Sequence, residues 1–315
     1  MLQYTRDRGI ISKRKDGKMK QINHTRRKQR KSFSLAAGLL TAIFIISIAA
    51  IPTSAARAAG YLPSGATEEI PITLDGRRIL DASAYLIDST TYVPLRAFCE
   101  AIDECDISWD SYSGTAIAAN DGIYLTATPG KRYISVNGRY FYTVQSVRNI
   151  DGRVYVPIRP MAKAFSLELE WDSESRSVRL YTTGKRTKWA SEVYNDDDIY
   201  WLARIINSEA GNQPFLGKMA VGNVVLNRVR SSQYPNTIYG VIFDRKHGVQ
   251  FSPILNGTIY KTPNTESIIA AKICLEGYSL SSTALYFLNP RIATSFWIVN
   301  NCTYEFSIGE HDFYR

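Results

Sequence analysis

The stretch LARIINSEAGNQPFLGKMAVGNVVLNRV, residues 202–229, decides the fold of the last third of the chain. Four residues in it and just before it recur at helical spacing: Ile199, Leu202, Ile206 and Glu209. The pattern places a carboxylate on the apolar face of a helix, where desolvation raises a pKa toward the range that a general acid needs. The alternative is a solvated glutamate at the helix end, because Ala210 and Gly211 follow directly.

Helical patterns continue along the rest of the chain. Pro214 is typical of a helix start, and residues 215–230 form a second predicted helix. On this helix we interpret Asn227 as a buried structural hydrogen-bonding residue rather than as a substrate contact. A third helix is predicted around residues 266–278, so residues 198–315 are expected to form a mainly α domain.

The middle of the chain contains an internal repeat with an offset of 62 to 63 residues. Three pairs of segments match: TYVPLR at 91–96 with VYVPIR at 154–159, ITLDG at 72–76 with ISVNG at 134–138, and SWD at 108–110 with EWD at 170–172. Matches in the same order at one offset predict two copies of a single structural unit.

Each copy has the pattern of a strand-rich unit. Hairpin-turn dipeptides stand at 75–76 (Asp-Gly) and 137–138 (Asn-Gly), and a helix is predicted from Leu95. A last hairpin is predicted through each Trp-Asp pair, and we expect the Trp, Tyr and Val residues of these motifs in the core. Arg96 and Arg159 are interpreted as backbone-binding residues near a helix start, with binding of an anionic polymer as the alternative.

The first 60 residues predict export. Residues 1–31 hold twelve Lys or Arg and two Asp or Glu, a net charge of +10 against +9 for the whole chain. Residues 33–51 form an uncharged apolar stretch of nineteen residues, which as a helix would be roughly 28 Å long, close to a bilayer's thickness. We interpret 1–32 as a basic cytoplasmic leader and 33–59 as a signal peptide or a transmembrane anchor. No nucleic-acid partner is predicted, and residues beyond 60 are expected outside the cytoplasm.

The cysteines and histidines do not have the spacing of a metal site. No CxxC pair is present and the three histidines are far apart in sequence, so neither a metal nor another cofactor is predicted. Outside the cytoplasm, Cys99 with Cys105 and Cys274 with Cys302 are candidate disulfides. Small buried thiols are the equal alternative.

The repeat resembles the copper amine oxidase N-terminal-like domain of exported proteins from Gram-positive bacteria. The TYVPLR and WD motifs carry the resemblance over residues 70–183. Because this segment contains no histidine, the resemblance implies no copper, but a stalk or wall-binding module with a possible wall-polymer ligand. The polar stretch that follows, residues 184–197, is predicted to be a linker.

The last third resembles the cell wall hydrolase domain of the spore cortex-lytic (SleB-type) family. The resemblance rests on the stretch quoted first and on three later blocks: QFSP at 250–253, ALYFLNP at 284–290 and IGEHDFY at 308–314. It implies a lysozyme-like fold over 198–315, with Glu209 as the catalytic residue. Candidate substrate-binding residues come from the later blocks: Gln250, Phe251, Tyr286, Asn289 and His311.

The expected architecture is therefore α+β, with a β-rich two-repeat stalk domain before a mainly α catalytic domain. The resemblance implies a secreted or membrane-anchored, peptidoglycan-cleaving lytic transglycosylase, which uses one glutamate on the MurNAc-GlcNAc bond of glycan strands. A hydrolytic muramidase would need a second carboxylate, and no second acid stands in a recognisable block. A non-catalytic wall-binding protein is the alternative from another class, since the repeats alone would support it.

Overall fold

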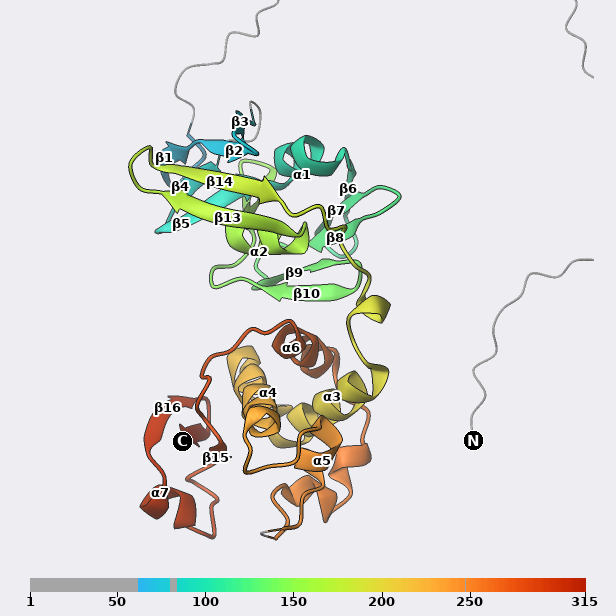
Figure 1. The fold of residues 1–315 in the computed structure, drawn as a ribbon, viewed down its shortest axis with the longest axis vertical. Coiled ribbons are helices and arrows are strands. Elements are labelled where there is room, and N and C mark those ends of the chain that lie inside the picture. Colours follow the sequence, from blue (N-terminus) through green and yellow to red (C-terminus); the bar gives the residue numbers. More distant parts are fainter. Residues whose placement is uncertain (1–61, 80–83, 247) are drawn as a thin grey trace, which may run out of the picture. The chain divides into compact units, whose positions relative to one another are not determined.

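The computed structural model describes residues 62–79, 84–246 and 248–315. The predicted leader and the predicted signal peptide or anchor, 1–32 and 33–59, lie outside these residues. Within the described part, no helix is long and apolar enough to span a bilayer. A β-rich part precedes a mainly helical part, as the sequence predicts (Figure 1).

The strands of the β-rich part form three sheets within the described residues. The first has the order β1-β4-β5-β12-β11, with bounds Ala66–Ile70, Ala84–Ile87, Thr90–Pro94, Arg153–Pro157 and Arg148–Ile150. The second has the order β10-β9-β8-β7-β6, with bounds Arg139–Tyr142, Tyr133–Val136, Tyr124–Ala127, Thr115–Ala119 and Asp106–Asp110. The third has the order β13-β14-β2-β3, with bounds Leu167–Asp172, Ser177–Thr182, Ile72–Leu74 and Arg77–Arg78.

Two helices fill the space between these sheets. The predicted helix from Leu95 is confirmed as α1, Leu95–Asp103, and its counterpart is α2, Ile158–Ala164. Phe98 of α1 is fully buried and meets the ring of Phe165 edge-on at 5.7 Å. Together with apolar residues of the three sheets, the two helices form the main core of this part of the chain, and a smaller cluster of Ile87, Tyr92 and Tyr155 lies apart from it.

The two halves of the β-rich part are joined through shared sheets. β5 of the first half pairs with β12 of the second, and Val93 lies opposite Val156. β2 runs parallel to β14, with Ile72 opposite Val178. Each half has the succession of hairpin, hairpin, helix and hairpin, but the internal repeat itself stays a prediction from the sequence.

The expectation that the motif tryptophans belong to the core is wrong. Trp109 is 47% exposed and Trp171 is 44% exposed, whereas Tyr92, Val93, Tyr155 and Val156 of the motifs are buried. Both tryptophans lie near the end of an edge strand, β6 or β13, where the core no longer covers the sheet. The aspartates that follow them accept turn N–H groups, as Asp110 does from Tyr112 at 3.0 Å, so these residues shape the hairpin turns.

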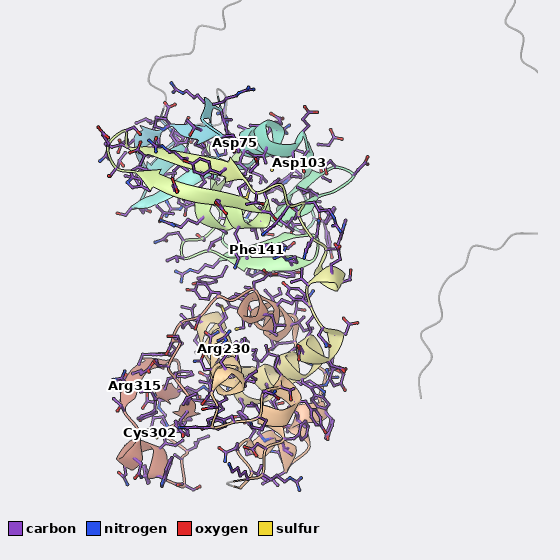
Figure 2. All side chains as sticks on the ribbon, in the orientation of Figure 1. Asp75, Asp103, Phe141, Arg230, Cys302 and Arg315 are labelled. Carbon is purple, nitrogen blue, oxygen red and sulfur yellow. The ribbon has the colours of Figure 1, made fainter. Side chains whose placement is uncertain are left out.

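The helical part is built around three helices. They are α3, Asp196–Ala210, α4, Phe215–Arg230, and α6, Thr265–Leu275, and they confirm the three predicted helices. Shorter elements surround them: α5, Ile238–Ile242, η2, Ser252–Ile254, η3, Thr258–Tyr260, and α7, Trp297–Asn301. A three-stranded sheet follows, with order β15-β17-β16 and bounds Tyr286–Leu288, His311–Tyr314 and Tyr304–Ile308. The chain ends at Arg315, which exchanges two backbone hydrogen bonds with Thr303, beside Cys302 (Figure 2).

Helix α4 is buried on nearly all sides. Gly222 allows this packing, because a Cβ there would lie 2.9 Å from both Cys274 Sγ and Ile206 Cδ1. Asn227 donates from Nδ2 to the carbonyls of Ser281 and Ala284, both at 2.9 Å. The interpretation of Asn227 as a structural residue is therefore confirmed.

The stretch predicted as a linker, residues 184–197, is partly buried. A short 3-10 turn, η1, Ala190–Glu192, lies in this stretch, and Thr187 and Tyr194 on either side of the turn are buried.

All four cysteines are free thiols in this structure, which corresponds to the alternative without disulfides.

Candidate active site

Glu209 lies in the last turn of α3, one residue before the helix ends at Ala210. Leu202 and Ile206, on the same face and in earlier turns, are fully buried in the core of the helical part. The helix therefore carries the Glu209 carboxyl to the border of this core, where the residue is partly buried. This agrees with the register expected from the sequence.

The surroundings of Glu209 weaken it as an acid. Burial raises the pKa of Glu209 to about 7, and the positive charge of Arg228 opposes part of this rise. Among the described residues, no hydrogen bond to the Glu209 side chain is found. A carboxyl that titrates near neutral pH is able to donate a proton in one step and to accept one in the next.

Five other carboxylates of the helical part form hydrogen bonds with residues other than Glu209. Four of them have their own partners: Glu266 has Lys218, Glu276 has Arg139 and Tyr194, Glu305 has the hydroxyls of Ser281 and Thr283, and Glu310 has Gln213 and Asn289. A fifth, Asp244, accepts the backbone N–H of Lys246 at 2.9 Å. None of these acids has an electrostatic influence on Glu209 comparable to that of Arg228.

Arg228 is the residue of this site that sequence reasoning missed. It comes from α4, is only 4% exposed, and donates from Nε to the carbonyl of Leu285 at 2.7 Å. The only signal in the sequence is a cation that follows Asn227 directly on a helix whose neighbouring residues are apolar. That signal is weak, because arginines usually extend from buried stems to the solvent.

Aromatic rings surround the Arg228 guanidinium. Its central carbon lies 5.1 Å from the ring centre of Tyr234, 5.2 Å from that of Phe251 and 5.5 Å from that of Tyr286. Tyr286 in turn meets the exposed ring of Trp297 edge-on at 6.0 Å. Two of the predicted substrate-binding residues, Phe251 and Tyr286, are thus brought together around one cation.

Phe251 and Gln250 differ in their access to solvent. Phe251 is 2% exposed and lies 6.4 Å from the ring of Phe287, so it supports the site from the core. Gln250 is partly exposed, and its Nε2 donates to the carbonyl of Gly248 at 3.3 Å. Of these two neighbours, Gln250 is the one whose side chain reaches the surface.

Asn289 and His311 lie with the C-terminal sheet. Asn289 donates from Nδ2 to Glu310 at 3.4 Å. His311 is 6% exposed, contacts the ring of Phe287 at 5.3 Å, and its Nδ1 has no hydrogen-bond partner within the described part of the chain. Burial lowers the pKa of His311, which favours a neutral structural imidazole.

A large cavity elsewhere has no part in this site. Its volume is about 730 Å³ and its lining includes Phe141, Arg159 and Trp171, but not Glu209 or Arg228. Arg159 is exposed there, and its counterpart Arg96 pairs with Glu100 at 3.5 Å rather than with the backbone. Because neither Glu209 nor Arg228 lines this cavity, we keep Glu209 as the candidate catalytic residue.

Comparison with known proteins assigns both parts of the chain to families. Residues 212–314 match the cell wall hydrolase family, and residues 73–180 match the copper amine oxidase N-terminal domain. The chain thus carries a cell wall hydrolase domain at its C-terminus, with a copper amine oxidase N-terminal domain before it. The hydrolase match begins three residues after Glu209.

Two curated relatives that are similar in sequence are spore cortex-lytic enzymes. That of Bacillus cereus is 38% identical over 120 residues, which cover 38% of this chain and 45% of the relative. That of Bacillus subtilis is 36% identical over 120 residues, which cover 38% of each chain. The chain therefore spans less than half the length of these two curated relatives.

Two solved structures are also similar in sequence. One is the catalytic domain of the germination-specific lytic transglycosylase SleB from Bacillus anthracis, 38% identical, with a TM-score of 0.36, covering 39% of this chain and 97% of that domain. The other is the catalytic domain of the Bacillus cereus SleB protein, 37% identical, with a TM-score of 0.35, covering 39% of this chain and 92% of that domain.

Proposed function

We propose that this chain cleaves the glycan strands of peptidoglycan in the bacterial cell envelope, and that Glu209 is its catalytic acid and base. The observation that carries the proposal is the partly buried carboxyl with a pKa of about 7, apart from the carboxylates that have partners of their own. The family match and the spore cortex-lytic relatives support peptidoglycan as the substrate class.

The proposed reaction needs one carboxyl group. Protonated Glu209 donates its proton to the oxygen between MurNAc C1 and GlcNAc C4 as the C1–O bond breaks. The resulting carboxylate then takes the proton of the MurNAc C6 hydroxyl, whose oxygen attacks C1 and forms a 1,6-anhydro ring. Glu209 is protonated again at the end and no water is consumed. The reaction class is that of a lytic transglycosylase.

We assign the roles of the remaining predicted substrate-binding residues according to how far their side chains are exposed to solvent. Gln250 and Tyr286 are the candidates for direct contacts, because both are partly exposed near Arg228 or its ring partners. Phe251 supports them from the core, and Asn289 and His311 shape the neighbouring sheet. The domain over 70–183 is proposed as a stalk or wall-binding module, and residues 33–59 as a signal peptide or a transmembrane anchor.

The experiment is mass spectrometry of the fragments released from purified peptidoglycan by the wild-type chain and by Glu209→Gln. We expect 1,6-anhydromuramic ends from the wild type, and a rate lower by at least ~10²-fold in the variant, the low end for a positioned acid–base group. Glu266→Gln and Glu305→Gln are controls with carboxylates of other partners, and both should stay active. Reducing ends would favour a hydrolytic muramidase, and binding without any new ends would favour a wall-binding protein.

A further inference from the structure

The cavity of about 730 Å³ is unused by the site at Glu209. Most of its lining residues belong to the β-rich part, and Ile273 and Glu276, at the end of α6, complete the lining. Cavities of roughly 300 to 1,000 Å³ with mainly apolar linings and a few polar groups are typical of small-molecule sites. The space therefore suits a short saccharide or a molecule of similar size.

The lining includes an accessible indole. Trp171 of β13 is 44% exposed, and its ring has no aromatic contact among the described residues. Trp109, in the same motif of the first half, is 47% exposed but does not line the cavity. Phe141 of β10 also belongs to the lining (Figure 2). An accessible indole suits a sugar ligand, because its electron-rich face attracts the C–H groups on the face of a sugar ring.

The charge of the lining is positive. Three cations take part in it, Arg159, Lys163 and Arg176, and Glu276 is the only acid among the described lining residues. Both carboxylate oxygens of Glu276 accept hydrogen bonds from Arg139, so this acid is already neutralised. Arg176 pairs with Glu68. Arg159 and Lys163 have no acidic partner in the described part of the chain, and both side chains are exposed.

The two helices of the β-rich part differ at this point. In α1, Arg96 pairs with Glu100, four residues later, at 3.5 Å. At the offset of 63 residues, Arg159 corresponds to Arg96 and Lys163 corresponds to Glu100. Helix α2 therefore carries two like charges four residues apart, an arrangement that destabilises a helix where the opposite pair would stabilise it. A bound anion would offset this repulsion.

We propose that this cavity binds an acidic saccharide of peptidoglycan, with Trp171 against the face of a sugar ring and with Arg159 and Lys163 at a carboxylate of the attached peptide. The inference rests on the proposed function and adds to it a second, non-catalytic glycan site. Arginine binds a carboxylate through two parallel hydrogen bonds, and lysine adds a compact charge. Peptidoglycan is favoured over a phosphate polymer of the cell wall, because the same chain carries a cell wall hydrolase domain.

The test is calorimetric titration of the full chain with the soluble muropeptide GlcNAc-MurNAc-tetrapeptide, which lacks the MurNAc-GlcNAc bond that the proposed reaction cleaves. Arg159→Ala and Lys163→Glu should each weaken binding by at least about 10-fold, because each removes a charged hydrogen bond to the carboxylate. Trp171→Ala should weaken binding by about 3- to 10-fold. Arg96→Ala and Trp109→Ala are the matched controls from the first half, and both should stay within about 2-fold of the wild type.

Two further ligands test the chemistry of the site. An uncharged GlcNAc disaccharide should bind at least about 10-fold more weakly than the muropeptide, because it has no carboxylate. A glycerol phosphate polymer that binds more tightly than the muropeptide, and loses its affinity in the same variants, would overturn the choice of peptidoglycan.

The inference is also wrong if the muropeptide does not bind, or if it binds the three cavity variants as tightly as the two controls. Thermal unfolding checks that each variant is folded, and since Arg159, Lys163 and Trp171 are all exposed, the loss of one variant leaves two others for the comparison. Failure of the proposed function looks different: the wild type would release no new glycan ends, or Glu209→Gln would retain full activity.

Discussion

At the scale of single residues, Glu209 links the chemistry of the site to the stability of the fold. The folded chain binds the Glu209 proton more tightly than the unfolded chain does, because burial raises the pKa of Glu209 from 4.5 to about 7. The folded state is therefore penalised above about pH 7, the penalty shrinks as the pH falls between the two values, and it is absent below the lower one.

The first prediction is that Glu209→Gln stabilises the protein in a pH-dependent way. At about pH 8 the variant should gain on the order of 1 to 3 kcal/mol in free energy of unfolding, because glutamine cannot ionise. At about pH 4.5 the wild-type carboxyl is mostly protonated in the folded state, so the gain should nearly vanish. Thermal unfolding of both proteins at the two pH values measures this, and an equal difference at both would contradict the prediction.

The sequence predicts part of this site for a physical reason. Glu209 could be placed because α3 is a long amphipathic helix, and spacing alone puts the carboxyl in register with Leu202 and Ile206. Arg228 could not be placed, because its partners are rings and a carbonyl from segments distant in the sequence. The prediction that Trp109 and Trp171 belong to the core is wrong because the ends of edge strands leave both side chains exposed, and the sequence motif does not show where a strand lies in its sheet.

At the scale of elements, the close approach of three helices positions the site. Gly222 of α4 lies against Ile206 of α3 and Cys274 of α6 without space for a side chain. Since Ile206 is one turn before Glu209, the distance between α3 and α4 also helps to fix the position of the Glu209 carboxyl. The sequence predicts the existence of these helices, but the side of contact depends on packing that periodicity does not encode.

The second prediction is that Gly222→Ala destabilises the helical part. Its Cβ would lie 2.9 Å from two buried side-chain atoms, so the helices must separate, at a cost of roughly 1 to 3 kcal/mol that outweighs the gain in helix propensity. Gly217→Ala in the same helix is the matched control, because its nearest contacts would be 3.3 and 3.4 Å. Chemical denaturation of both variants gives the comparison, and a Gly222→Ala protein as stable as Gly217→Ala would refute this account of the packing.

At the scale of the whole described unit, a buried ion pair connects the β-rich part to the helical part. Arg139 of β10 donates from two nitrogens to the two oxygens of Glu276, each at 2.7 Å, and the Tyr194 hydroxyl donates to the same carboxylate at 2.6 Å. The side chains of Arg139 and Glu276 are only 13% and 5% exposed. The predicted linker thus contributes Tyr194 to this contact, while the domain boundaries at 183 and 198 stay predictions.

The third prediction is that Glu276→Gln lowers the free energy of unfolding by about 3 to 5 kcal/mol. The loss comes from leaving Arg139 buried without an opposite charge. Glu192→Gln is the control, because it breaks an exposed pair with Arg186 and should have a clearly smaller effect. Denaturation of residues 62–315 and its two variants provides the measurement. Equal losses would mean that the buried pair contributes no more than a surface one.

The parallel pairing of β2 with β14 has a consequence for folding during synthesis on the ribosome. Ile72 is made early, yet its neighbour Val178 emerges only after more than a hundred further residues have been synthesised. Until then one edge of β2 has no partner, so this part of the chain cannot finish folding while it grows. Pairings of such long sequence separation slow folding. A nascent chain stalled before residue 177 should therefore remain open to proteases and chaperones, and one stalled well after residue 182 should resist them.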